Sequence, residues 1–224
     1  AYLDTIGVLP TLEEAREFLA ETSPDKREKL VDSLLSRPEF VDYWSYKWSD
    51  LLLLNGNRLR PKALDSYYKW IRSSVEQNIP WNEFARQIVT AKGSTFSKGA
   101  ANFFALHEDP LDMAETVSMA FLGMSINCAR CHDHPLEKWT NDQYYAMASH
   151  FARVRAKGWA GSPTAGDGLR TLFVTSSGEL IQPLSGTPQP ATPLDGEPLD
   201  ASFQGDRRVP LAQWLTPPGN TLFS

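Results

Sequence analysis

Both cysteines of the chain stand three positions apart in the stretch NCARCHDHPLEKW, residues 127–139, and a histidine follows the second one directly. Cys128, Cys131 and His132 form the pattern C-x-x-C-H, which is the attachment signature of a c-type haem. Each thiol adds to one vinyl group of the porphyrin, and the adjacent imidazole becomes an axial ligand of the iron. The motif therefore predicts one covalent haem c, with His132 as a metal ligand.

The same side chains leave other interpretations open. A zinc ion could be bound by the two thiols together with His132 and His134, although structural zinc sites usually take two ligand pairs from separate segments. A C-x-x-C redox motif normally opens a helix after a strand, and no strand is predicted there. A disulfide between Cys128 and Cys131 would be strained, and a chance match to the haem pattern is the remaining alternative.

Apolar and aromatic residues flank the motif on both sides, as they do in a haem pocket. Such walls exclude water and raise the reduction potential of the iron. Apolar residues at helical spacing also face any protein core, so the composition permits a pocket without requiring one. The residues predicted to contact the haem from these walls are Phe121, Met124, Trp139, Tyr144 and Met147.

The second axial ligand of the iron is less constrained by the sequence. His134 is too close to His132 to reach the opposite haem face, and we expect it to hydrogen-bond a propionate or the backbone. His107, in a loop before the preceding helix, is the favoured sixth ligand, and Met147 comes next. An open or water-bound position is a further alternative. The other candidates are His150, Met113, Met119 and Met124.

Local signals place the motif in the linker between two helices. Thr11 with Glu14, and Thr140 with Gln143, have the spacing of capping boxes that open helices. Prolines at the start of other apolar-periodic segments suit a first helical turn. Helices are predicted over 11–21, 24–36, 38–54, 61–78, 81–92, 110–127 and 140–156. The segments 110–127 and 140–156 therefore position the motif.

The composition changes after Gly158, where glycines and prolines become frequent. The segment 169–184 predicts a β-hairpin that turns at Ser177-Gly178, the segment 185–200 is Pro-rich and extended, and 207–220 can form one last short helix. The expected fold is mainly α, a multi-helix domain with a c-type haem between two helices, plus a small β-hairpin and an extended C-terminal tail. The predicted division is a helical domain over 1–157, an extension over 158–204 and the start of a following domain over 205–224.

The overall composition excludes several function classes. The formal charge is −5 without a stripe of Lys and Arg, so a nucleic-acid role has no electrostatic support. Apolar runs such as residues 51–54 are only a few residues long, too short to span a membrane. No signal peptide is visible, and the chain begins at Ala1 without Met, which indicates a mature or trimmed piece. No paired carboxylates, Ser-His-Asp arrangement or phosphate-binding loop stands out.

The stretch FLGMSINCARCHDHPLEKWTNDQYYAMASHFARVRAKG, residues 121–158, resembles the domain of unknown function 1549, the planctomycete-type cytochrome c-like domain. The resemblance extends upstream over most of the chain and downstream to DRRVPLAQWLT, residues 206–216, which resembles the opening of the companion domain 1553. It implies a haem c on Cys128, Cys131 and His132, an exported protein in the periplasm or at the cell surface, and further domains of a larger parent protein. It implies no reaction.

Three functional hypotheses follow from the motif and the resemblance. The first is an extracytoplasmic electron-transfer module that docks a redox partner protein and turns over no substrate. The second is a haem enzyme that acts on peroxide or another small molecule through an open distal position, where His107 or Arg153 could supply polar groups. The third is a haem-free scaffold or metal-binding domain. Whether the chain is an enzyme is left open, with a redox module favoured over a stand-alone enzyme.

Overall fold

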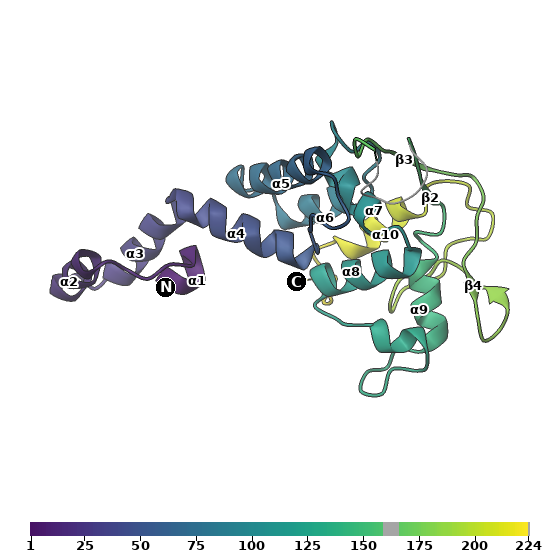
Figure 1. Cartoon of the computed structure of the whole chain (residues 1–224). Coiled ribbons are helices and arrows are strands. Elements are labelled where there is room, and N and C mark those ends of the chain that lie inside the picture. The colour runs from purple at the N-terminus through teal and green to yellow at the C-terminus, as the bar shows by residue number, and fades with distance from the viewer. Residues whose placement is uncertain (159–165, 224) are drawn as a thin grey trace.

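The computed structural model describes residues 1–158 and 166–223 and consists mostly of helices (Figure 1). An elongated N-terminal arm projects from a rounder body, which contains the later helices and the strands. The α-helices are α1 (Tyr2–Ile6), α2 (Leu12–Ala20), α3 (Lys26–Leu35), α4 (Pro38–Leu51), α5 (Pro61–Glu76), α6 (Trp81–Val89), α7 (Asn102–Leu106), α8 (Pro110–Leu122), α9 (Asn141–Ala148) and α10 (Arg208–Leu215). The 3₁₀ helices are η1 (Gly99–Ala101) and η2 (Asn127–Arg130). The strands are β1 (Gly93–Ser94), β2 (Val154–Lys157), β3 (Thr171–Val174), β4 (Ile181–Gln182) and β5 (Thr187–Pro188).

The arm is built from α1, α2, α3 and most of α4, and local caps define its helices. Thr11 accepts the backbone N–H of Glu14, whose carboxylate accepts the N–H of Thr11, so the predicted capping box is confirmed. The Arg37 guanidinium lies 2.7 Å from the Glu14 carboxylate, which ties the start of α4 to α2. The indole N–H of Trp44 donates to the carbonyl of Thr5 at 3.1 Å, which holds α1 against α4.

The body has one apolar core, to which α5, α6, α7, α8, α9 and α10 contribute. Tyr67 on α5, Phe121 on α8 and Phe151 after α9 are each 0% exposed. Aromatic rings extend this core toward the arm, where the centroids of Trp48 and Trp81 lie 4.0 Å apart. Burial of a large apolar side chain contributes roughly 1.5–3 kcal/mol, so this core is what fixes α8 and α9 around the cysteine motif.

The β-structure differs from the predicted hairpin over 169–184. The first predicted strand is present as β3, but β3 is the centre of a three-stranded antiparallel sheet in the order β1-β3-β2. Gly93 of β1 and Ala156 of β2 both pair with Leu172 of β3. The second predicted strand is β4, and it pairs with β5 instead of β3. The expected turn at Ser177-Gly178 is therefore wrong, because β3 pairs with the more distant β1 and β2, whereas β4 pairs with β5, which follows it in the chain.

Helix α9 is shorter than the predicted helix over 140–156. Its start is as expected, because Thr140 accepts the backbone N–H of Gln143 at 3.2 Å and the Gln143 side chain accepts the N–H of Thr140. The helix ends at Ala148, and Val154–Lys157 is a strand paired with β3. The helical expectation for the last residues is wrong because long-range pairing outweighs local propensity.

The C-terminal part of the chain packs onto the body. Helix α10 confirms the predicted last helix, and its Leu211 and Leu215 are 0% exposed. Arg208 is 1% exposed and is neutralised by Asp206, 2.7 Å away, as a buried guanidinium requires.

The three-part domain division stays a prediction. Within the described ranges, no helix has both the length and the apolar character needed to cross a membrane.

Candidate functional site

The C-x-x-C-H motif lies on the surface of the body in the connection between α8 and α9. Helix α8 ends at Leu122 and is capped by Gly123, whose left-handed conformation, with φ 62°, is one that a residue without a side chain adopts at little cost. Cys128 is in η2 and Cys131 follows it, and the backbone N–H of Cys131 donates to the carbonyl of Cys128 at 3.4 Å. Both thiols are free and exposed. They are therefore accessible to a reactant from solvent.

His132 is exposed next to the two thiols. Its Nδ1 lies 2.7 Å from the backbone carbonyl of Asp133. A carbonyl only accepts, so Nδ1 carries the proton and donates, and the lone pair is left on Nε2. A ring nitrogen held in this way fixes the tautomer and orientation of a metal-ligating imidazole. His132 thus has the form that an axial ligand needs, with Nε2 available.

His134 has a structural role within the same loop. Its Nδ1 accepts the backbone N–H groups of Leu136 at 3.2 Å and Glu137 at 2.9 Å. Its own backbone N–H donates to the carbonyl of Trp139 at 2.8 Å. Backbone hydrogen bonding is one of the two roles expected for His134. It also occupies Nδ1, so this nitrogen is not free to bind zinc.

Asn141, at the first position of α9, joins this helix to the cysteine motif by hydrogen bonds. Its side-chain N–H₂ donates to the carbonyls of Ala129 at 2.7 Å and Arg130 at 3.0 Å. Its backbone N–H donates to the carboxylate of Asp133 at 2.9 Å, and its side-chain oxygen accepts from Gln182 at 2.7 Å. Asn141 is 6% exposed. The cysteine turn is therefore held in one conformation by a buried amide that the sequence did not indicate.

The residues predicted as haem walls are packed into the protein core. Phe121, Tyr144 and Met147 are 0% exposed and Trp139 is 2% exposed, whereas Met124 is partly buried against the same core. Tyr144 donates from its hydroxyl to Glu115 at 2.6 Å. Burial, followed by the hydrogen bond to that carboxylate, raises the pKa of the Tyr144 hydroxyl.

This packing corrects the expected fold class. The wall side chains belong to the common apolar core or pack against it, and Phe121 lies against Trp81 of α6. Across residues 1–158 and 166–223, no group of three or more His, Cys, Asp or Glu side chains is arranged to hold a metal ion. The expectation of a haem enclosed between two helices is therefore wrong, and the zinc alternative with two thiols and two histidines is not assembled. The reason is that apolar residues at helical spacing packed into the common core.

The candidates for a sixth ligand lie at separate places. His107 follows α7 and is 4% exposed, with Nε2 3.4 Å from the carbonyl of Leu52. His150 is 1% exposed and donates from Nδ1 to the carbonyl of Arg207 at 2.9 Å. In the described part of the chain, no hydrogen bond or ring contact joins either one to His132. Met113 and Met147 are buried and Met119 is 40% exposed on α8. The sixth-ligand assignment stays a prediction.

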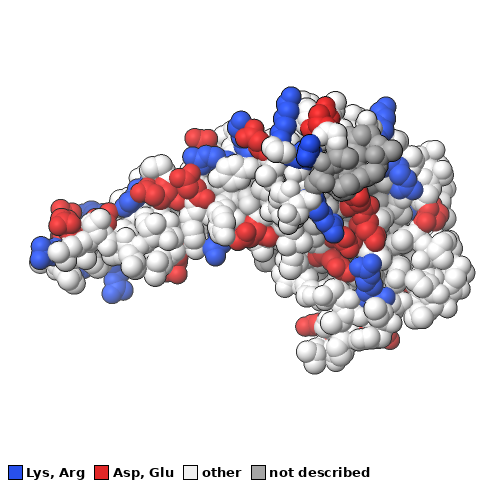
Figure 2. All heavy atoms as spheres, viewed as in Figure 1, with Lys and Arg blue, Asp and Glu red and all other residues white. Residues whose placement is uncertain are grey.

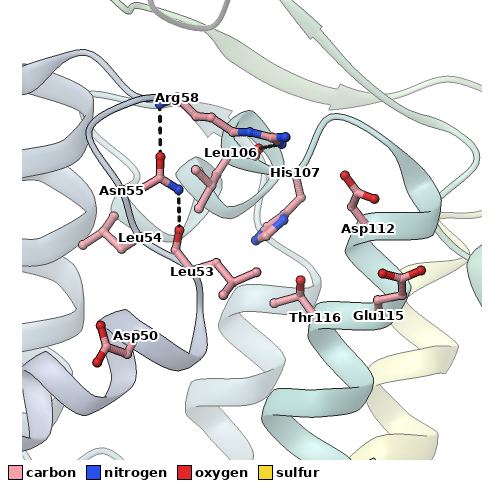
Figure 3. A pocket seen from close by; sticks show the side chains of 10 residues that line it. All are labelled: Asp50, Leu53, Leu54, Asn55, Arg58, Leu106, His107, Asp112, Glu115 and Thr116. Atoms are coloured by element: carbon pink, nitrogen blue, oxygen red, sulfur yellow. Dashed lines mark hydrogen bonds between the residues drawn. The ribbon is translucent and has the colours of Figure 1, made fainter. Parts of the chain in front are cut away.

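A pocket of about 590 Å³ lies beside His107, between the end of α4 and α8 (Figure 3). Burial lowers the pKa of His107 to about 4, with a smaller effect of Arg58 in the same direction. Acidic side chains gather on this face, over α7 and α8 (Figure 2). Arg130 of the motif lies 3.5 Å from Asp112 and 3.6 Å from Glu115, so the pocket adjoins the motif. The residues that line it are Asp50, Leu53, Leu54, Asn55, Arg58, Leu106, His107, Asp112, Glu115 and Thr116.

The sequence alone does not indicate this pocket, because its walls are about fifty residues apart in the chain. No local motif joins Asp50 to Asp112. The only local signal on the α8 side is that Asp112 stands in the first turn of a helix, which the helix dipole favours without any ligand.

Residues 1–156 match the family model described as PSCyt2, Protein of unknown function (DUF1549). The chain belongs to the DUF1549 family. The matched range includes the arm, the cysteine motif, α9 and the pocket residues. No curated protein and no solved structure matches the chain. Membership in DUF1549 thus gives the family without giving a reaction or a cofactor.

Proposed function

We propose that this DUF1549 chain carries one haem c, bound covalently through Cys128 and Cys131, and acts as an extracytoplasmic electron-transfer module. The proposal rests on the exposure of the two thiols and on the hydrogen bonding of the adjacent imidazole. Two accessible thiols stand beside an imidazole whose Nδ1–H is held by a carbonyl, so Nε2 is free. These donors fit thioether attachment and axial ligation of a haem. Such a haem supplies one-electron chemistry at iron.

The residues of the chain have separate roles in this proposal. The thiols of Cys128 and Cys131 would hold the porphyrin, and His132 would ligate the iron through Nε2. Asn141 keeps the turn in place by binding the carbonyls of Ala129 and Arg130, so the three donors stay at fixed spacing. The loop is exposed, so the haem would lie at the surface with an edge accessible to another protein.

Surface attachment favours electron transfer over catalysis. A redox partner protein needs a short distance to the haem edge, and an exposed loop provides it. The location that goes with the proposal is the periplasm or the cell surface, because haem c is attached after export. We also propose that residues 206–216 are the start of a companion domain 1553.

The test is to export the chain into a compartment that attaches haem c and to analyse the purified protein. We expect c-type bands in the pyridine haemochrome spectrum and a mass that exceeds the polypeptide by one haem after extraction with acid and acetone. Cys128→Ser and Cys131→Ser should each leave a single thioether and a shifted band, and the double variant should lose the haem. His132→Ala should retain the thioethers but change the axial-ligand spectrum.

The proposal is wrong if the exported wild-type protein is colourless, has the mass of the bare polypeptide and reacts with two equivalents of a thiol reagent. Should the two thiols instead copurify with zinc or form a disulfide under the same conditions, the haem-free alternatives would replace it.

A further inference from the structure

The N-terminal arm has an open apolar groove of about 750 Å³ at the end that projects away from the body (Figure 1). Helices α1, α2 and α3 form its walls, together with the loop between α1 and α2. Most of the residues that line it are apolar. They include Tyr2, Leu3, Leu9, Pro10, Ala15, Phe18, Leu19, Leu30 and Val31.

The leucines of this groove are unusually accessible for side chains of their size. Leu3, Leu9 and Leu19 are 54%, 72% and 78% exposed. No residue of α2 is buried, although Ala15, Phe18 and Leu19 share one face of this helix. A helix this short takes most of its stability from packing its apolar face, and a contiguous exposed apolar patch marks an interface. The groove is therefore a surface for a partner.

The charged side chains that line the groove differ between its two ends. Asp4 belongs to α1, which lies against α4 on the side toward the body. Glu14 starts α2 and is already paired with Arg37 at the start of α4. Arg27 is in the first turn of α3, at the outer tip of the arm (Figure 1). The groove is thus acidic at its inner end and basic at its outer end.

Asp4 and Arg27 are both accessible to a partner. Arg27 is exposed and makes no ion pair within residues 1–158 and 166–223. The Asp4 side chain is 90% exposed and lies 3.4 Å from the amino group of Ala1, an exposed pair that contributes little. A two-fold symmetric contact requires a surface that complements itself. A second copy turned end for end over the groove meets this requirement, because its basic end then covers the acidic end of the first.

From these observations we infer that two copies of the chain form a dimer by packing their arms groove to groove, with Arg27 of each copy beside Asp4 of the other. The leucines of the two grooves are buried against each other in this contact. An unrelated partner would have to supply both charges in the reverse order, whereas a second copy already carries them. The cysteine motif lies on the body, outside the groove, so the dimer does not depend on the haem proposal.

Sedimentation velocity of the purified protein between about 1 and 100 μM tests the dimer, because this range covers a micromolar Kd. We expect the dimer fraction to rise with concentration. Leu19→Glu should abolish the dimer in this range, because it would bury an unpaired carboxylate in the contact. Leu184→Glu changes a leucine of the body that is 75% exposed, and as the matched control it should leave the dimer unchanged. Circular dichroism establishes that each variant is folded.

Exchange of the two charges tests the two-fold arrangement. Asp4→Arg and Arg27→Asp should each weaken self-association about tenfold, since like charges then face each other at both ends. Combining both changes in one chain should restore the dimer. An equimolar mixture of the two single variants should form a mixed dimer, because opposite charges meet at both ends again.

Three results would overturn the inference. The first is a wild-type protein that stays monomeric at about 100 μM, which would leave the groove to a different protein or to another part of the parent chain. The second is a dimer that Leu19→Glu does not affect. The third is a mixture of Asp4→Arg and Arg27→Asp that associates no more tightly than either variant alone.

Discussion

Replacing Asn141 by Ala tests whether a buried amide holds the cysteine turn. The substitution removes the two donors to the carbonyls of Ala129 and Arg130 and the acceptor for Gln182. Asn141 is 6% exposed, so water does not readily replace these partners. A buried polar group left without its partner costs about 1–3 kcal/mol. The carbonyl of Ala129 is buried but that of Arg130 is only partly buried, so the expected loss lies in the lower part of the sum for two carbonyls, at roughly 2–4 kcal/mol.

Thermal unfolding followed by circular dichroism measures this loss. At about 2–4 °C per kcal/mol for a chain of this size, Asn141→Ala should lower Tm by roughly 4–16 °C. Hydrogen exchange should rise in residues 127–140 before it rises in the core. Asn141→Asp should be at least as destabilising, because a carboxylate would then face two carbonyls.

The control is Asn127→Ala, which removes only an exposed contact with Ser125 and should change the free energy of unfolding by less than about 0.5 kcal/mol. The anchoring role of Asn141 is refuted if its Ala variant unfolds within 1–2 °C of Asn127→Ala, about what a surface change gives, and exchanges at the wild-type rate in the loop.

Three further predictions concern the core, a close approach and the pH dependence. Phe121→Ala should destabilise the haem-free protein by roughly 3–5 kcal/mol in denaturant unfolding, because Phe121 packs 5.2 Å from Trp81 between ring centroids; a loss under about 1 kcal/mol would contradict its place in the core. Gly99→Ala should lower stability by roughly 1–3 kcal/mol, since an added Cβ would lie 2.6 Å from the carbonyl of Ser66, and an unchanged Tm would refute that approach. Burial lowers the pKa of His150 from 6.5 to about 4, so the unfolded chain binds the proton first as the pH falls. Stability should then decrease between pH 6.5 and 4 by up to about 3 kcal/mol from this residue, and His150→Gln should flatten that slope in Tm measured against pH.

The helix starts were determined largely by the sequence itself. Thr11 and Thr140 are capped as their spacing indicates, and Pro38, Pro61 and Pro110 stand at the first positions of their helices. These signals work because a cap or a proline satisfies or removes backbone donors within one turn. The interaction is complete within four residues of chain, so no distant segment has to be known.

Only the tertiary structure decided the strand partners, the burial of the predicted haem walls and the pocket. Thr171–Val174 reads as a strand locally, but its pairing with Gly93–Ser94 joins residues nearly eighty positions apart. Phe121 has the same helical spacing whether it faces a cofactor or other side chains, and close packing in the core selected the second. Asp50 and Asp112 meet across one pocket because α4 and α8 pack on the same core. Such contacts depend on which apolar surfaces are buried against each other, and that is a property of the whole folded chain.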